Sequence, residues 1–155
     1  MSIGIQPYLH VRSASNPVYR PGGSKISFIT NYTGLPQVWE LNLNGAWPSQ
    51  NTFTEERIMF VSYINGCSIR IIGMDIGVNE RQQLFLLKDD GGLQPLTDSP
   101  AHIHQYGGSS PDGNWISWAS NRRHTAYFDI YIQSLETLEI KKVFEADGSN
   151  VSKIA

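Results

Sequence analysis

Three serine-containing stretches are the first places to look for nucleophilic chemistry. Acyl transfer by a serine hydrolase needs a nucleophile, a base, a group that orients the base and an oxyanion hole. In one large class the nucleophile stands in a Gly-x-Ser-x-Gly turn between a strand and a helix. The closing glycine is missing from Gly22-Gly23-Ser24-Lys25-Ile26, Gly66-Cys67-Ser68-Ile69-Arg70 and Gly107-Gly108-Ser109-Ser110-Pro111. We therefore expect no catalytic residue in this sequence.

Histidine, aspartate and cysteine side chains offer little for a metal ion. His102 and His104 have a spacing that zinc can use on one strand face, but no second His or Cys pair completes a ligand set. The run Asp89-Asp90-Gly91-Gly92 lacks the alternating oxygen ligands of a calcium loop and fits a hairpin turn. Cys67 follows a turn glycine and precedes an apolar segment, which favours a packed thiol over a reactive one. We expect no metal ion and no cofactor.

An arginine pair is the remaining candidate for ligand recognition. Arg122 and Arg123 fall in a polar stretch, residues 121–127, that we expect to be a loop between two strands. Guanidinium groups bind carboxylates in bidentate fashion, so the pair could contact a partner protein or the carboxylate of a substrate. A solvated loop is the alternative interpretation.

The composition narrows the classes of partner. The chain has 155 residues and a formal net charge of -2, without a block of like charges, which argues against binding to nucleic acid. No stretch approaches the roughly 18 apolar residues of a membrane helix, and the amino terminus lacks a signal-peptide pattern. A single cysteine, Cys67, fits a reducing compartment. We expect a soluble, cytoplasmic protein that binds neither nucleic acid nor membrane.

A glycine recurs at a nearly constant spacing. Gly23, Gly66 and Gly113 each stand three residues before an isoleucine, and they are 43 and 47 residues apart. With these glycines aligned, three apolar pairs fall on one face of a strand: Ile26 and Phe28, Ile69 and Ile71, Ile116 and Trp118. The repeated alternation predicts three copies of one unit.

A second marker supports the same period. An aliphatic residue followed by an aromatic one occurs at Val38-Trp39, Leu84-Phe85 and Ile130-Tyr131, each 46 residues after the last. We expect the large aromatic residues at the marker positions to pack between units: Trp39, Phe85, Trp118 and Tyr131, together with Trp47 and Trp115.

These markers predict an all-β chain. Glycine and proline are frequent, 14 and 8 residues, and no window keeps a helical apolar stripe free of them. Four-stranded units of about 40 to 50 residues in series are typical of β-propeller blades, whereas a sandwich or barrel would not require one frame to recur. We expect three antiparallel blades at about 17–54, 57–98 and 102–146, with 147–155 as a linker or the start of a further blade. Closed propellers have about four to eight blades, so this would be an incomplete propeller.

The third unit resembles a known family. The runs Gly107-Gly108-Ser109-Ser110-Pro111-Asp112-Gly113, Ala119-Ser120-Asn121-Arg122-Arg123 and Phe128-Asp129-Ile130-Tyr131 resemble a blade in the N-terminal propeller of prolyl oligopeptidase family (S9) serine peptidases. The similarity is to acylaminoacyl-peptidase-like and dipeptidyl-aminopeptidase-like enzymes, and it covers roughly residues 16 to 152. The Ser-Pro-Asp-Gly turn alone is a mark of the wider TolB-like and WD40-like propellers.

The sequence departs from the family pattern in two places. The first two units have Pro21-Gly22-Gly23-Ser24 and Asn65-Gly66-Cys67 in place of the Ser-Pro-Asp-Gly turn. The first unit also has Gln50-Asn51-Thr52 where such propellers often show Leu-Thr. Both departures concern local geometry.

The resemblance implies a non-catalytic role. The chain would be a propeller segment of a serine peptidase, and it would gate the access of peptides to an α/β-hydrolase domain that these residues do not contain. Its partners would be further blades, that domain and, in that setting, a peptide substrate. The alternative is a stand-alone TolB-like module for protein binding.

Two further expectations concern the chain by itself. The turn residues Gly23, Gly66, Ser110, Pro111, Asp112 and Gly113 are expected to be structural, because proline, aspartate and glycine each suit one position of a tight turn. Open blade faces would leave apolar surface uncovered, so the isolated chain is expected to self-associate.

Overall fold

Three four-stranded antiparallel sheets make up the fold. The computed structural model describes residues 12–145 of the chain. Blade 1 contains β1 (Ala14–Tyr19), β2 (Lys25–Thr30), β3 (Gln37–Asn42) and β4 (Ser49–Gln50). Blade 2 contains β5 (Ile58–Tyr63), β6 (Arg70–Asp75), β7 (Gln82–Leu87) and β8 (Leu93–Pro95). Blade 3 contains β9 (His104–Ser109), β10 (Trp115–His124), β11 (Tyr127–Ser134) and β12 (Ile140–Phe144).

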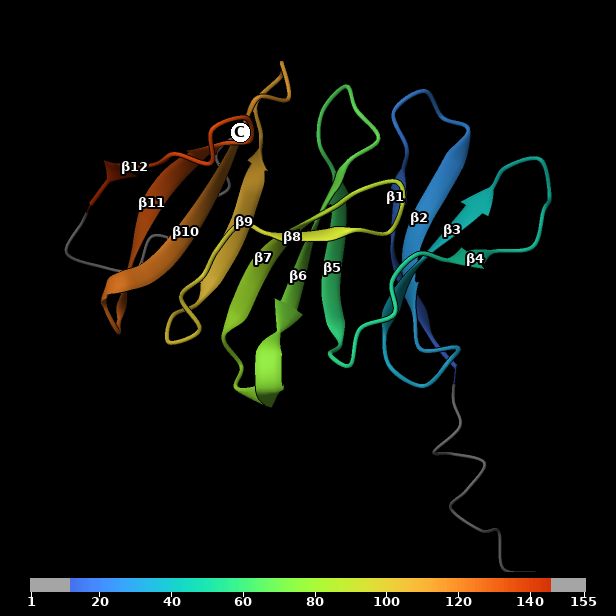
Figure 1. Ribbon diagram of the computed structural model, residues 1–155, viewed down its shortest axis with the longest axis horizontal. Coiled ribbons are helices and arrows are strands. Elements are labelled where there is room, and N and C mark those ends of the chain that lie inside the picture. Colours follow the sequence, from blue (N-terminus) through green and yellow to red (C-terminus); the bar gives the residue numbers. More distant parts are fainter. Residues whose placement is uncertain (1–11, 146–155) are drawn as a thin grey trace, which may run out of the picture.

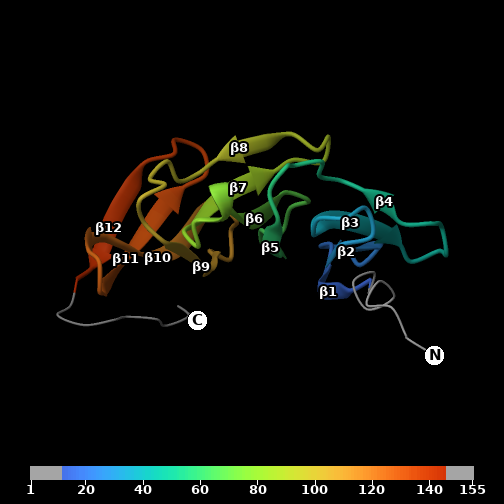
Figure 2. The ribbon, with the colours of Figure 1, turned by 90° about the horizontal axis from the view of Figure 1, so that it is seen from below.

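The sheets stand side by side in chain order (Figure 1). They form an arc, in which the first strand of each blade (β1, β5, β9) lies on the inner side and the fourth strand lies on the outer side (Figure 2). The arc of described residues does not close. The expected all-β fold of consecutive blades in an incomplete propeller is therefore confirmed. The predicted linker or further blade, residues 147–155, lies outside the described residues.

Two apolar clusters fill the spaces between neighbouring blades. The cluster between blades 1 and 2 consists of Ile29, Val38, Ile58, Val61, Ile72, Met74, Phe85 and Leu87. The cluster between blades 2 and 3 consists of Ile64, Ile71, Leu84, Leu86, Leu96, Ile116, Trp118 and Tyr131. Alternate residues of blade 2 belong to different clusters, because successive side chains of a strand point to opposite faces. Both faces of this blade are covered.

The turn between the first two strands of each blade has the same six-residue form. It closes with a backbone hydrogen bond from Arg20 N to Lys25 O, from Ile64 N to Ile69 O and from Ser110 N to Trp115 O, at 2.9, 3.0 and 2.8 Å. Gly23 and Gly113 occupy the fourth position of their turns with φ of 71° and 72°, whereas Gly66 occupies the third with φ of 74°. Glycine adopts this left-handed conformation without steric cost, and in blade 1 Gly22 at the third position adopts it too, with φ of 89°. The glycine of blade 2 is thus displaced by one position relative to Gly23 and Gly113.

This displacement makes the sequence alignment of blade 2 wrong by one residue. Arg70 aligns with Ile26 and Ile116, because these three follow the turn by the same number of residues and pair with Leu87, Leu41 and Gln133. Ile72 likewise aligns with Phe28 and Trp118. The predicted shared face of Ile69 and Ile71 therefore belongs to the opposite side of the blade.

Blade 3 contains a strand that is longer than predicted. β10 continues through Arg122 and Arg123 to His124, which pairs with Tyr127 across an irregularity that begins after Ser120. The loop predicted at residues 121–127 is therefore reduced to a turn at the hairpin end. Among the described residues the helical content is one short 3₁₀ segment, η1 (Ile76–Val78). None of these residues forms a helix long and apolar enough to cross a bilayer.

Candidate functional site

The hydroxyl groups of the described residues form no catalytic constellation. Ser99 Oγ lies 2.6 Å from His102 Nδ1, but the two residues belong to one turn, in which His102 N also donates to Ser99 O. Within residues 12–145 no carboxylate hydrogen-bonds His102 to orient it. A nucleophile and a base without an orienting group and an oxyanion hole do not make an acyl-transfer site.

The Ser110 to Gly113 turn is held together by its own side chains. Asp112 accepts hydrogen bonds from Ser110 Oγ and from the backbone and side-chain nitrogens of Asn114. The serine bond in particular holds the pKa of the Asp112 carboxyl below its ordinary value. Ser110 Oγ also accepts from Trp115 N at 3.0 Å. The serine and the aspartate are thus engaged within the turn, and Pro111 is exposed between them.

This turn also joins blade 3 to blade 2. Asn65, in the equivalent turn of blade 2, donates its side-chain amide to the carbonyls of Ser109 and Ser110 at 3.2 Å each. Gly113 lies so close to Asn65 that an added Cβ would meet the Asn65 carbonyl oxygen at 2.6 Å. Sequence reasoning missed Asn65, whose position beside Gly66 suggested only local turn chemistry.

The two arginines of the predicted ligand contact have internal partners. Arg123 forms a bidentate pair with the buried Asp129, with both N···O distances at 2.9 Å, and this bond lowers the pKa of the Asp129 carboxyl. Arg122 donates from Nε to His104 Nε2 at 3.0 Å and lies 3.6 Å from the exposed carboxylate of Asp98. A ligand carboxylate would have to compete with these contacts. The proposed contact role of the pair stays a prediction.

His104 belongs to an aromatic stack at the contact between blades 2 and 3. Its ring meets Trp118 edge-on at 5.3 Å, Trp118 stacks on Tyr131 at 4.5 Å, and the Arg122 guanidinium lies 5.0 Å from the Trp118 ring. Burial and the neighbouring Arg122 charge lower the pKa of the His104 imidazole to about 4. The side chain is therefore neutral at pH 7 and accepts the arginine hydrogen bond.

A buried charge network lies at the contact between blades 1 and 2. Arg70, only 1% exposed, donates to Ser27 Oγ at 3.2 Å and lies 3.9 Å from the Glu40 carboxylate. Tyr63 shares both partners through its hydroxyl, and burial raises its pKa above the ordinary value. In the sequence Arg70 stands between Ile69 and Ile71, on the strand face opposite to that apolar pair. The available signal was an arginine directly before the apolar run Ile71-Ile72 of the strand.

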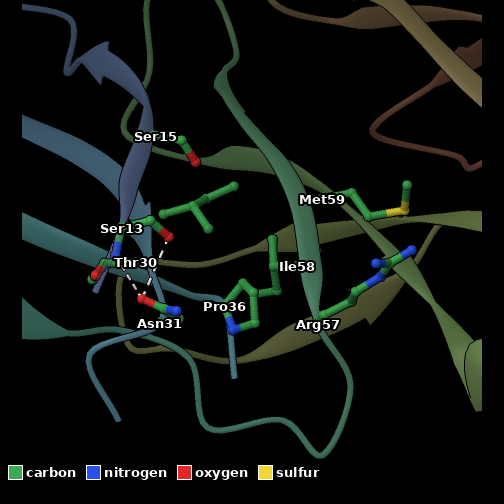
Figure 3. Close-up of a pocket in the computed structure, with 9 residues that line it drawn as sticks. Ser13, Ser15, Thr30, Asn31, Pro36, Arg57, Ile58 and Met59 are labelled. Atoms are coloured by element: carbon green, nitrogen blue, oxygen red, sulfur yellow. Dashed lines mark hydrogen bonds between the residues drawn. The ribbon is translucent and has the colours of Figure 1, made fainter. Parts of the chain in front are cut away.

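A polar pocket of about 280 Å³ opens beside this contact, near the inner strands β1 and β5. Figure 3 shows its lining: Ser13, Ser15, Ile29, Thr30, Asn31, Pro36, Arg57, Ile58 and Met59. Asn31 Oδ1 accepts hydrogen bonds from Ser13 N and Ser13 Oγ at 2.8 and 3.4 Å (Figure 3). Arg57 is half exposed, with its guanidinium 3.9 Å from Asp75. Hydroxyl, amide and guanidinium groups around an open pocket suit a polar or anionic ligand.

An aromatic surface occupies the side of blade 1 that faces away from blade 2. A hollow of about 200 Å³ is lined there by Phe28, Thr30, Tyr32, Trp39, Trp47 and Pro48. Trp39 is 8% exposed, and Tyr32 covers part of it edge-on at 5.8 Å. The prediction that Trp47 packs between units is wrong for the described residues, because its side chain is 79% exposed. Its loop, between β3 and β4, meets no neighbouring blade there.

Trp115 is half-buried and lies in neither cluster, whereas three other aromatic marker residues lie in the interior. Phe85 belongs to the cluster between blades 1 and 2, whereas Trp118 and Tyr131 belong to the cluster between blades 2 and 3. Cys67 packs beside the latter cluster and its thiol faces Ile64 O at 3.8 Å. The Asp89 to Gly92 run forms the β7–β8 turn, closed by Lys88 N to Gly92 O at 2.9 Å. Residues 12–145 contain no group of three or more His, Cys, Asp or Glu side chains that could hold a metal ion.

The departure at Gln50-Asn51-Thr52 leaves the blade geometry unchanged. Thr52 Oγ1 accepts a hydrogen bond from Val38 N at 2.9 Å, and Thr97 Oγ1 accepts one from Leu84 N at 3.0 Å. The two threonines therefore make equivalent hydrogen bonds in blades 1 and 2. Each bond joins the segment after the fourth strand to the third strand of the same blade.

Comparisons with known proteins agree on the fold. No protein-family model matches the sequence, and no curated protein is significantly similar to it. Among solved structures, TolB from Acinetobacter baumannii matches 89% of this chain with a TM-score of 0.67 and 15% identity. A puromycin-hydrolyzing peptidase from Mycobacterium tuberculosis matches 90% of this chain with a TM-score of 0.65 and 14% identity. Dipeptidyl peptidase 4 from Porphyromonas gingivalis matches 83% of this chain with a TM-score of 0.68 and 8% identity.

The chain is shorter than these proteins. It spans 34% of the TolB chain, 22% of the puromycin-hydrolyzing peptidase and 18% of the dipeptidyl peptidase. At these identities the likeness establishes the fold alone. The described residues have the propeller fold shared by TolB and by the peptidases of the S9 family, in agreement with the resemblance seen in the sequence.

Proposed function

We propose that this chain is a non-catalytic propeller segment of a prolyl oligopeptidase-like serine peptidase. In this role it restricts the entry of peptides to a catalytic α/β-hydrolase domain carried by the rest of a longer polypeptide. The observation that carries the proposal is the fold match to two peptidase propellers, combined with the lack of a serine, histidine and acid constellation within residues 12–145. The expected cytoplasmic location belongs to the same proposal and is checked by cell fractionation.

The polar pocket supports contact with a peptide. Its lining comes from β1, β2, β5 and the segments next to them, and two of these strands, β1 and β5, lie on the inner side of the arc, where a propeller surrounds its central passage (Figure 2). Arg57 supplies a half-exposed positive charge there, and the neighbouring Ser13 and Asn31 supply polar atoms. A peptide moving through the passage would meet these groups before reaching the hydrolase domain.

The reading frame beyond Ala155 provides the decisive test. We expect it to encode further blades and then a Gly-x-Ser-x-Gly turn. The longer polypeptide should react covalently with a fluorophosphonate probe and cleave aminoacyl or prolyl chromogenic substrates, whereas residues 1–155 alone should do neither. A frame that ends without the turn, or probe labelling of the 155-residue chain, would contradict the proposal.

The gating role has a separate test in the longer polypeptide. Arg57→Ala should raise KM for peptides with a free carboxylate and leave kcat unchanged, because the pocket touches the peptide before the chemical step. Arg81→Ala, which removes an exposed arginine between β6 and β7, is the matched control. Equal kinetics in both variants would exclude a role for the pocket in peptide entry.

The alternative function is a TolB-like module for protein binding. It is favoured by the TolB fold match and by the exposed aromatic surface of blade 1. The same reading-frame experiment separates the two functions, because this module needs neither a nucleophile turn nor reaction with the probe.

A further inference from the structure

The loop between β6 and β7 exposes apolar side chains on a strained backbone. Val78 is 78% exposed there, and Ile76 is 43% exposed. Val78 also has a φ of 54°, in the left-handed region that a β-branched residue adopts only at a steric cost. An exposed valine gains little from burial, so the fold of the described residues by itself does not account for a valine at this position.

Carboxylates hold the loop in this form. Asp75 is 1% exposed, and its carboxylate accepts hydrogen bonds from Asn79 N at 2.9 Å and from Glu80 N at 3.0 Å. Glu56, in the linker before β5, accepts one from Gly77 N at 2.8 Å. The loop is thus preorganised, and little conformational freedom is left to lose when a partner binds its apolar side chains.

Other non-glycine residues at positive φ have a role inside the chain. Asn16, with φ of 50°, accepts a hydrogen bond from Val61 N at 2.7 Å and so joins blade 1 to blade 2. Leu138, with φ of 61°, closes the β11–β12 turn by donating from its backbone N to Ser134 O at 3.0 Å. Val78 belongs to neither apolar cluster between blades. Its conformation therefore suggests a contact outside the described residues.

The loop belongs to one edge of the arc, which we call the linker edge. The linker before β5 joins its segments, because Glu56 contacts Gly77 and the Glu56 carbonyl accepts a hydrogen bond from Gln37 Nε2 at 3.0 Å. The edge consists of three segments that reach the lower side of Figure 1: the β2–β3 turn (31–36), the β4–β5 linker (51–57) and the β6–β7 loop (76–81). These segments contain five exposed apolar residues: Tyr32, Leu35, Phe53, Ile76 and Val78.

The opposite edge of the arc has a different composition. It carries the three six-residue turns between the first and second strands, and none of these described turns contains an exposed large apolar residue. The exposed apolar residues towards this edge lie in β1 or in the outer turns between third and fourth strands: Tyr19, Leu43, Trp47 and Leu138. A partner that binds two adjacent blades through apolar contact is therefore favoured at the linker edge.

The polar pocket reaches the linker edge and indicates what the partner is. Asn31 and Pro36 of the β2–β3 turn and Arg57 at the end of the linker belong to its lining (Figure 3). The Arg57 guanidinium lies 3.9 Å from the carboxylate of Asp75, the residue that holds the β6–β7 loop. A peptide that passes the pocket would leave it beside this loop, so we expect the domain that receives the peptide to lie there.

We propose that the β6–β7 loop is a docking contact for the hydrolase domain of the longer polypeptide, which takes Ile76 and Val78 into an apolar depression of its own surface. This inference rests on the proposed function, because that function supplies the domain. Burial of Val78 in the contact offsets the steric cost of its backbone conformation. The loop thereby fixes the hydrolase domain beside the polar pocket.

Photo-crosslinking in the longer polypeptide tests the contact directly. Val78→p-benzoylphenylalanine should crosslink to a segment of the hydrolase domain, identified by mass spectrometry of the tryptic peptides. Leu43→p-benzoylphenylalanine, at a 49% exposed site towards the opposite edge, is the matched control and should not reach that domain. The docking contact is refuted if position 78 gives no crosslink, crosslinks to another blade or to a second copy, or reaches the hydrolase domain no more than position 43 does.

Two substitutions at Val78 separate docking from the stability of the loop. Val78→Gly removes the steric cost of the positive φ, so it should raise the melting temperature of the 155-residue chain by about 2 to 4 °C. In the longer polypeptide Val78→Gly and Val78→Asp should both speed proteolytic cleavage between the two domains, roughly tenfold for the aspartate, because a buried apolar anchor is lost. Leu43→Asp should leave this rate unchanged. Equal rates in Val78→Asp and Leu43→Asp would contradict the docking contact.

Labelling with the fluorophosphonate probe keeps a failure of this inference apart from a failure of the proposed function. If the longer polypeptide reacts with the probe but neither crosslinking nor proteolysis distinguishes position 78 from position 43, the hydrolase domain is present and docks elsewhere. If the reading frame encodes no such domain, the proposed function fails and the docking contact fails with it.

Discussion

The two contacts between described blades use the same positions for different chemistry. Between blades 1 and 2, Arg70 and Glu40 form a buried charge network beside an aliphatic cluster. Between blades 2 and 3, the stacked Trp118 and Tyr131 of blade 3 pack in a cluster with apolar residues of blade 2, and the position of Arg70 is taken by Ile116. The repeat thus fixes where side chains meet, while the residue types change in pairs across the contact. This paired change is what makes each blade specific for its neighbour.

The largest effect is expected at the aromatic contact. Trp118→Ala should lower the free energy of unfolding by about 3 to 5 kcal/mol, because a side chain that is 1% exposed leaves a large cavity. Urea unfolding followed by circular dichroism gives the value. Ile72→Ala, at the same register position in the other contact, removes a smaller side chain and should cost less. A larger loss in Ile72→Ala would reverse our ranking of the two contacts.

The second-largest loss of stability is expected at the contact between Arg70 and Glu40. Arg70→Met should cost about 2 to 3 kcal/mol, because Glu40 and Ser27 lose a buried partner. In the double variant with Glu40→Leu the loss should be smaller than the sum of the two single losses, because the pair shares one contact, although Glu40 also pairs with Lys25 at 2.7 Å. Arg81→Met, an exposed site, should change little. Losses that simply add in the double variant would show that Arg70 and Glu40 act independently.

A smaller, pH-dependent effect is expected from His104. Its pKa is held at about 4 in the folded chain, against an ordinary value of 6.5. Below about pH 6.5 the unfolded chain takes up a proton that the folded chain does not bind until about pH 4, so the free energy of unfolding falls as the pH is lowered through this window. His104→Gln should flatten this dependence in urea titrations, whereas His124→Gln, at an exposed site, should keep it. An unchanged slope in His104→Gln would contradict the assignment.

The smallest effect separates two glycines with the same backbone conformation. Gly23→Ala and Gly113→Ala both place a side chain at positive φ, which costs about 1 kcal/mol. Gly113→Ala should cost about 1 kcal/mol more, because its Cβ would lie 2.6 Å from the Asn65 carbonyl oxygen while Gly23 has open space around it. Equal melting temperatures for the two variants would show that Gly113 and Asn65, in the turns of blades 3 and 2, are not in close steric contact.

Sequence reasoning predicted the blades because the repeat leaves local signals. The aliphatic and aromatic markers at Trp39, Phe85 and Tyr131 do hold equivalent strand positions. The glycine marker misled the alignment at blade 2, since Gly66 serves the same kind of turn from a different position. Nothing local distinguishes these two uses of glycine. The hydrogen bonds that close the turn are needed to align Arg70 with Ile26 and Ile116.

The contacts of the candidate site residues were harder to predict from the sequence than the blades were, because the folded chain decides them. Asn65 became a contact between blades because the chain brings it to Ser109 and Ser110, 44 and 45 residues away. The sequence leaves Arg123 either to a ligand carboxylate or to a solvated loop, and an extension of β10 sets it against Asp129. The Asn65 contacts are long-range, and the Arg123 pairing depends on how far β10 extends; composition and spacing specify neither.

The sequence by itself determined an all-β chain of repeated four-stranded units, because alternation and turn chemistry act over a few residues. Only the tertiary structure decided which neighbour each strand face meets. In a blade both faces can be buried, so alternation separates the residues into two sets without assigning either set to a neighbour. The stacking order of the blades made that assignment. It placed Arg70 against Glu40 and Trp118 against blade 2, and it left Trp39 and Ile130 on two uncovered faces.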